Sequence, residues 1–180
     1  ALFIPFLPML PSQILLVNLL SDFPLVAVAS DKVDLSESRK PKFHQLKNFI
    51  PLIITLALIS TIFDLIFFYI FHEVEPPLLR TLWFIESVLT EIFLIFSIRT
   101  SRFFLKGSMP SIILILFSIA TVTTTIFLPF TAFGQKAFYF VAPPIPKLLT
   151  VLSLILLYFS LSEAAKLIYF RQKRNHRSAS

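Results

Sequence analysis

Apolar residues occur in five long runs, which short polar or proline-containing segments separate. The runs extend from about Ser12 to Ala29, Phe49 to Phe71, Leu82 to Ile98, Pro110 to Phe130 and Pro146 to Phe170. Each comes near the roughly 20 apolar residues that a helix needs to cross a bilayer. Strict alternation of apolar and polar residues is absent, which disfavours a β-barrel. The pattern therefore predicts an all-α integral membrane protein, a bundle of five transmembrane helices.

Composition supports this class and excludes several others. Of the 180 residues, 56% are hydrophobic and only 14% are charged, whereas soluble domains carry roughly 25% charged residues. The absence of Cys excludes disulfides, thiol catalysis and Cys-ligated metal centres. Two Gly residues leave no glycine-rich phosphate loop, and no H-E-x-x-H or G-x-S-x-G motif occurs. The sequence therefore offers no catalytic residue.

Basic residues indicate how the helices are oriented. All but three of the 16 Lys and Arg residues lie in the connections 31–48 and 99–108 and in the segment after residue 165. Because Lys and Arg concentrate in cytoplasmic loops, these segments are predicted to be cytoplasmic, with the N-terminus outside and the C-terminus inside. The net charge of +6 is split among three segments with no aromatic stacking platform, so no nucleic acid partner is expected.

Three polar residues interrupt the first apolar run. Asn18, Ser21 and Asp22 have the spacing i, i+3, i+4, which is predicted to place them on one helix face. An amide, a hydroxyl and a carboxylate offer oxygen ligands for a hard cation. An ionisable group in a span costs roughly 2.5–3.5 kcal/mol on insertion scales, so Asp22 calls for a functional reason. We predict a cation site here, with Asn18 and Asp22 as metal ligands; the alternative is hydrogen bonding to neighbouring helices.

Pro24 lies inside the same run, two residues after Asp22. It has no N–H to donate to the carbonyl of Leu20, and its ring opens that turn. Irregular backbone is tolerated at membrane depth where it lines a cavity, as in the broken helices of transporters. We therefore expect the Leu20 carbonyl to serve as a further oxygen ligand.

Further acidic residues lie within the predicted spans. Glu86 and Glu91 are about 140° apart around the third helix, so they cannot reach one point on a straight helix. Each is a candidate cation ligand, with a hydrogen-bonded or proton-sharing structural Glu as the alternative. Asp64 in the second span is expected to be structural. Glu163 precedes Lys166 by three residues, which predicts an ion pair at the cytoplasmic interface.

The segment FIPFLPMLPSQILLVNLLSDFPLVAVASDKVD, at residues 3–34, resembles the sixth transmembrane helix of P-type cation-transporting ATPases with its flanks. That family carries an N-x-x-[TS]-D ligand motif, which reads NLLSD at residues 18–22. QILLVN is similar to the calcium-pump branch, whereas FLPMLP, WFIES at 83–87 and RT at 99–100 are most similar to the magnesium-translocating branch. The resemblance covers the whole chain, as helices six to ten.

The resemblance implies that residues 1–180 are the C-terminal transmembrane domain of such a pump. It also implies that Glu91 matches the acid of the eighth helix in the calcium branch by position, and that Glu86 is the acid of the magnesium branch's WFIE motif. The D-K-T-G-T phosphorylation motif, the cytoplasmic domains and helices one to five do not occur in this sequence, which starts at Ala1. ATP and its Mg²⁺ would bind those domains, so this chain holds no cofactor and is not expected to hydrolyse ATP alone.

The expected function is therefore that of the membrane part of an ATP-driven cation pump, multi-pass in the plasma (inner) membrane. Mg²⁺ is favoured as the transported ion, and the expected partners are the lipid bilayer, the transported cation and the remaining helices and cytoplasmic domains of the pump. The alternative is a self-contained five-span membrane subunit, or an inactive truncated fragment, without transport activity. A D-K-T-G-T motif upstream of Ala1 would decide for the pump.

Overall fold

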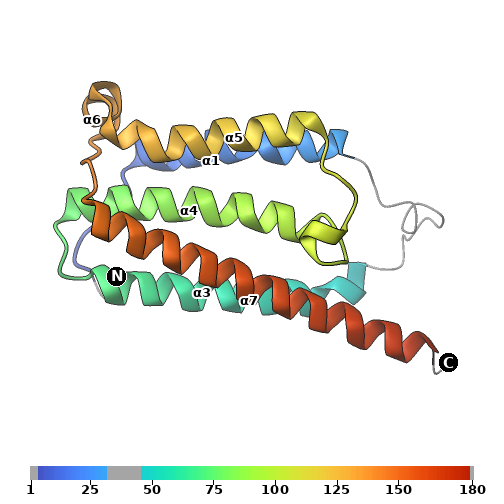
Figure 1. Cartoon of the computed structure of the whole chain (residues 1–180). Coiled ribbons are helices and arrows are strands. Elements are labelled where there is room, and N and C mark those ends of the chain that lie inside the picture. Colours follow the sequence, from blue (N-terminus) through green and yellow to red (C-terminus); the bar gives the residue numbers. More distant parts are fainter. Residues whose placement is uncertain (1–3, 32–45, 179–180) are drawn as a thin grey trace.

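The computed structural model describes residues 4–31 and 46–178, and helices account for most of them (Figure 1). The five longer helices are α1 (Pro11–Ala27), α3 (Leu46–Phe71), α4 (Pro76–Ile98), α5 (Ile112–Phe127) and α7 (Ile145–Ser178). The shorter elements are helix α6 (Ala132–Phe138) and the 3-10 turns η1 (Val28–Ser30), η2 (Phe104–Lys106) and η3 (Leu128–Phe130). These two ranges contain no strand, so the prediction of an all-α fold is confirmed.

Four helical segments are long and apolar enough to cross a membrane: 49–71, 76–98, 112–130 and 145–172. α1 is apolar but has only 17 residues. At 1.5 Å per residue it reaches about 26 Å, slightly less than the roughly 30 Å hydrocarbon core, and η1 continues it by a further turn. The chain is thus a multi-pass membrane protein.

Prolines explain where two helices begin and correct two predicted boundaries. α1 starts at Pro11 and α4 at Pro76, positions where a missing N–H costs nothing. α4 therefore begins six residues earlier than the apolar run predicted. Pro51 lies inside α3. Pro110 precedes α5, whose N-cap is Ser111, so this helix begins two residues later than the apolar run predicted.

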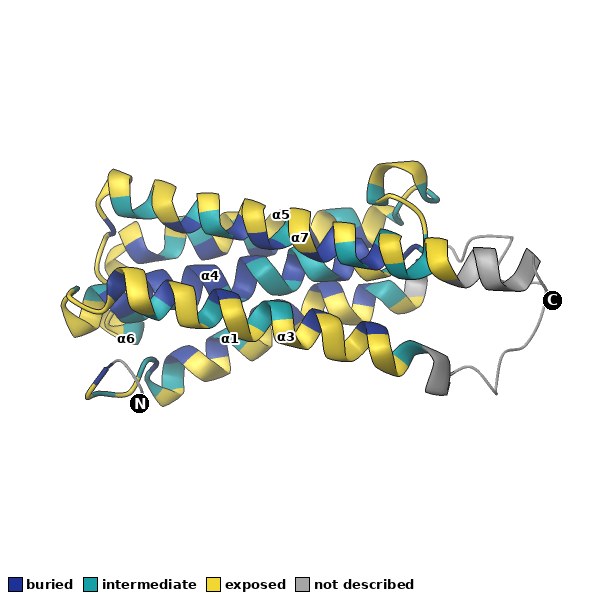
Figure 2. Cartoon of the chain, turned by 90° about the horizontal axis from the view of Figure 1, so that it is seen from below, coloured by how far each residue is buried: buried dark blue, intermediate teal, exposed yellow. Residues whose placement is uncertain are grey.

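α4 is the central helix of the bundle. It packs against α7, α1 and α5, while α3 packs on α7 and α1 packs on α5. In the apolar part of α4, 56% of the residues are buried, compared with 17–28% in the apolar parts of α3, α5 and α7. Figure 2 shows the exposed positions on the outer faces of the other helices. α4 therefore joins an α1–α5 pair to an α3–α7 pair.

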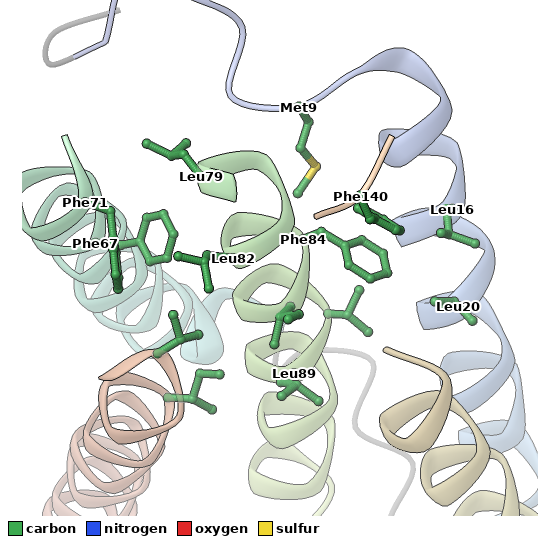
Figure 3. Packing of buried hydrophobic residues seen from close by; sticks show 14 of the residues in the cluster. Met9, Leu16, Leu20, Phe67, Phe71, Leu79, Leu82, Phe84, Leu89 and Phe140 are labelled. Atoms are coloured by element: carbon green, nitrogen blue, oxygen red, sulfur yellow. The ribbon is translucent and has the colours of Figure 1, made fainter. Parts of the chain in front are cut away.

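Aromatic side chains fill both sides of α4 toward the α6 end of the bundle (Figure 3). Phe84 packs on Phe140, with ring centroids 4.6 Å apart. Trp83 packs on Phe67 and Phe68, with centroid separations of 5.0 and 4.5 Å. Lipid tails are as apolar as these side chains, so van der Waals packing rather than burial from water holds the helices together here.

The ends of α1, α4 and α7 and the starts of α3 and α5 lie at one end of the bundle (Figure 1). The basic connection 99–108 and the C-terminal part of α7 are therefore at the same end, as the predicted orientation requires. Five of the basic residues used for that prediction fall in or beside residues 32–45, and the side chains of all five lie outside the described residues.

Candidate cation site and buried polar clusters

The polar residues of α1 divide between two faces of the helix. Asn18 and Asp22 are exposed, whereas Ser21 is only 3% exposed. Ser21 Oγ donates a hydrogen bond to the backbone carbonyl of Asn18 at 3.4 Å. Because consecutive helix residues are about 100° apart, packing that turns Ser21 inward turns Asp22 outward. The three residues lie within about 100° of one another around α1, as their spacing predicts, but the boundary of the packed surface runs between Ser21 and the exposed pair.

The Asn18–Asp22 pair can supply only part of a cation's coordination shell. One carboxylate and one amide carbonyl stand one turn apart on an exposed face of α1. Hard cations take six or more oxygen ligands. In the part of the chain that the structure describes, no group of three or more His, Asp or Glu side chains converges to hold a metal ion. A cation at this pair therefore needs further oxygen ligands from hydroxyl, amide or backbone groups, from water, or from outside the described residues.

The carbonyl that Pro24 leaves free has a different partner from the one predicted. Thr121 Oγ1 on α5 donates a hydrogen bond to the Leu20 carbonyl at 3.0 Å, and both groups are buried. Pro24 is itself buried on the face that packs toward the bundle. The expectation that the Leu20 carbonyl is a cation ligand is thus corrected: the open turn joins α1 to α5.

We expect Thr121→Val to weaken the α1–α5 contact, because the Leu20 carbonyl would lose its donor while the side chain keeps its shape. Interhelical hydrogen bonds in membranes contribute about 0.6 kcal/mol on average and up to about 1.7 kcal/mol. Unfolding in mixed micelles measures this loss. Thr124→Val, at an exposed position of the same helix, is the matched control. Equal effects of the two substitutions would contradict the assignment.

The two predicted acids of α4 differ in burial. Glu86 is 4% exposed, whereas Glu91 is half-buried. Asp64 on α3 is also half-buried, and Asp22 on α1 is exposed. The structure does not gather Asp22, Glu86 and Glu91 into one group of three acidic side chains.

The Glu163–Lys166 ion pair is confirmed, and both side chains are buried within the bundle. Lys166 Nζ is 2.7 Å from Glu163 Oε1 and donates to the Ser97 carbonyl at 2.8 Å. Ser97 Oγ donates to Glu163 Oε2 at 2.6 Å, and the Phe104 N–H donates to Oε1 at 2.8 Å. The Lys166 side chain is 0% exposed. This network ties α7 to the end of α4 and to η2, and the signal in the sequence was a lysine inside an apolar run.

A second buried ion pair at the same end was missed from the sequence. Arg99 Nε is 2.8 Å from Asp31 Oδ2, and both side chains are under 10% exposed. The Ser111 N–H donates to Asp31 Oδ1 at 2.7 Å, and an Arg99 Nη donates to the Ser108 carbonyl at 2.6 Å. The pair thereby fixes the segment after η1 to the end of α4 and the start of α5. Its residues are 68 positions apart, so no local pattern could reveal it.

One family model and several curated proteins match the sequence of this chain. A family model described as "Cation transporting ATPase, C-terminus" matches residues 6–168. The chain is 29% identical over 177 residues to the "Magnesium-transporting ATPase, P-type 1" of Escherichia coli strain K12, over 94% of this chain and 20% of that protein. A protein of the same name from Salmonella typhimurium strain 14028s is 28% identical over the same shares of both chains. One from strain LT2 is 31% identical over 139 residues, which is 73% of this chain and 15% of that protein.

The chain spans about one fifth of the length of the first two of these curated relatives. The family match includes α1, α3, α4 and α5 completely and α7 up to residue 168. The exposed polar pair and both buried ion pairs lie within it. The chain therefore belongs to the family of C-terminal regions of cation-transporting ATPases.

Proposed function

We propose that this chain is the membrane-embedded part of an ATP-driven cation pump, in which Asn18 and Asp22 bind the transported ion. The observation that carries the proposal is the exposed Asn18–Asp22 pair on a helix of a multi-pass membrane protein of this family. The relatives named above are magnesium-transporting, and carboxylate and amide oxygens suit Mg²⁺. Mg²⁺ is therefore the ion we propose.

The exposed pair also implies what covers it. A carboxylate facing lipid near the middle of a span costs roughly 2.5–3.5 kcal/mol, and charged side chains in membranes face a bundle interior or a water-filled cavity. Asp22 is exposed in the structure of this chain. We therefore place the other helices of the pump against this face of α1, where they would complete the coordination shell. The cytoplasmic domains of the same pump would bind ATP with its Mg²⁺ and carry the phosphorylated Asp.

The other predicted ligands take different places in this proposal. Ser21 positions the backbone of Asn18 through its hydrogen bond and does not face the ion. Glu91, half-buried on α4, stays a proposed additional ligand. Glu86, which is 4% exposed on α4, also stays a proposed additional ligand.

Reconstituted vesicles test the function itself. The full-length protein that contains this chain should carry Mg²⁺ across the vesicle membrane when ATP is supplied, and Ca²⁺ more slowly. A preparation that hydrolyses no ATP and moves no cation would favour a structural membrane subunit instead.

The orientation of the chain is a further prediction. We predict that the end of the bundle with the basic segments is cytoplasmic, and with it the C-terminus, in a plasma-membrane protein, because Lys and Arg concentrate in cytoplasmic loops. A protease-cleavable tag after Ser180 should be protected in intact cells and cleaved in inverted vesicles. Cleavage in intact cells would show that the C-terminus lies outside, so the topology would be the reverse of the predicted one.

A further inference from the structure

Leu20, whose carbonyl is bonded to α5, lies midway along the turn of α1 that carries the exposed polar pair. It comes two residues after Asn18 and two residues before Asp22. At about 100° per residue, Leu20 is about 200° around the helix from each of them, which is nearly the opposite side. Leu20 is 9% exposed, whereas Asn18 and Asp22 are exposed. The turn that offers two candidate ligands on its outer side is therefore attached to the bundle on its inner side.

Thr121 supplies the attachment from α5. Its Oγ1 donates to the Leu20 carbonyl at 3.0 Å, and Thr121 is 3% exposed. A regular helix would satisfy this carbonyl with the N–H of residue 24, but Pro24 has no N–H. Nearby, Phe23 packs on Phe117 of α5 with ring centroids 5.7 Å apart. Ring packing tolerates small rotations, whereas a hydrogen bond weakens steeply when its donor and acceptor are turned out of line.

Two other buried hydroxyl groups of α5 provide a contrast with Thr121. Ser118 and Thr125 share its helix face, at spacings of three and four residues. They are 5% and 0% exposed. Neither hydroxyl has a hydrogen-bond partner in the part of the chain that the structure describes. Burial of a hydroxyl on this face therefore does not by itself produce a bond to α1, and the bond of Thr121 depends on the carbonyl that Pro24 leaves free.

We propose that Thr121 is a positioning residue for the cation site on α1. By holding the Leu20 carbonyl, it fixes how this turn is rotated about the helix axis, and so fixes the direction in which Asn18 and Asp22 face. The inference rests on the proposed function of the α1 pair. Both ligands are on one turn, so a rotation would move them together, away from the other ligands of the ion.

The effect of α5 on the ion is indirect. Residues 112–127 include no Asp, Glu, His, Lys or Arg, so α5 offers no charged ligand. The Thr121 hydroxyl is buried against the inner side of α1, away from the pair. Metal sites commonly depend on such groups, which orient the ligands without touching the ion, and their loss costs about 10–100-fold in affinity.

Equilibrium binding of Mg²⁺ to the full-length protein, without ATP, tests the proposal. Thr121→Val keeps the shape of the side chain and removes the donor. We expect the Mg²⁺ dissociation constant to rise about 10-fold, while the number of ions bound at saturation stays the same. Thr121→Ser keeps a hydroxyl and should restore most of the affinity. Thr125→Val makes the same substitution one turn away, at a buried hydroxyl without a partner, and should leave the dissociation constant unchanged.

The Asp22→Asn variant, measured alongside, separates this proposal from the proposed function. If Asp22→Asn loses high-affinity binding while Thr121→Val keeps the wild-type dissociation constant, Thr121 does not position the site. Fewer bound ions at unchanged affinity would also overturn the proposal, because Thr121 would then only stabilise the fold. So would equal rises in Thr121→Val and Thr125→Val. An Asp22→Asn protein that binds Mg²⁺ as the wild type does would overturn the proposed function and this inference with it. Thr121→Ala removes the same donor and replaces Thr121→Val if that variant does not fold.

Discussion

Asp22→Asn is expected to abolish high-affinity Mg²⁺ activation of the full-length pump while leaving the fold intact. Asn is nearly isosteric with Asp and is cheaper to place in a membrane, so stability should not fall. The substitution removes the only charge on the exposed polar face of α1. Losing even an outer-shell partner of a metal ligand costs about 10–100-fold in affinity. We therefore expect the Mg²⁺ concentration for half-maximal phosphorylation to rise by at least about 100-fold.

The control removes a negative charge outside the membrane. Glu73→Gln lies in the exposed connection between α3 and α4 and should leave Mg²⁺ activation unchanged. Asn18→Ala should weaken activation by less than Asp22→Asn, because it removes a neutral oxygen. Similar small effects at residues 18, 22 and 73 would leave the α1 pair without a role in ion binding.

Lys166→Met is expected to give the largest loss of stability of any single substitution proposed here. It leaves the Glu163 carboxylate buried with the Ser97 hydroxyl and the Phe104 N–H as donors but without its cation. Breaking a buried ion pair by removing one partner costs about 3–5 kcal/mol. The free energy of unfolding in mixed micelles should fall by an amount in that range. The end of α4 and η2 should become more accessible to protease.

The double variant Glu163→Leu/Lys166→Met tests whether the loss of stability in Lys166→Met comes from leaving the Glu163 carboxylate without its cation. Replacing a buried ion pair by apolar residues of similar size is often neutral or stabilising, so the double variant should be more stable than Lys166→Met alone. Lys147→Met, near the opposite end of α7, should have little effect. A double variant less stable than the single one would mean that Glu163 contributes mainly through its bonds to α4 and η2.

The helices could be predicted from the sequence because each apolar run comes near the roughly 20 residues that a helix needs to cross a bilayer. Their starts were harder to predict, since Pro76 reads equally well as part of a connection or as the first residue of a helix. The spacing of Asn18 and Asp22 correctly placed them one turn apart on one face. That spacing could not show which neighbour α1 packs against, and this packing is what turns Ser21 inward.

Partners that lie far apart in the sequence account for most of what the sequence could not show. Thr121 reaches the Leu20 carbonyl across 101 positions, and Arg99 reaches Asp31 across 68. Lys166 reaches the Ser97 carbonyl across 69 positions because α7 packs on α4. Each contact depends on which helices are neighbours, and a hydropathy pattern says which segments are helices without saying how they are arranged.

The most direct test of the central claim is to count the ions that the α1 pair binds. Equilibrium binding of Mg²⁺ should be measured on the full-length pump without ATP and on its Asp22→Asn variant, at matched folding judged by thermal unfolding. We predict that high-affinity binding to the wild-type protein is lost in the Asp22→Asn variant. A folded Asp22→Asn variant that binds as many Mg²⁺ ions with the same affinity as the wild type would contradict the account.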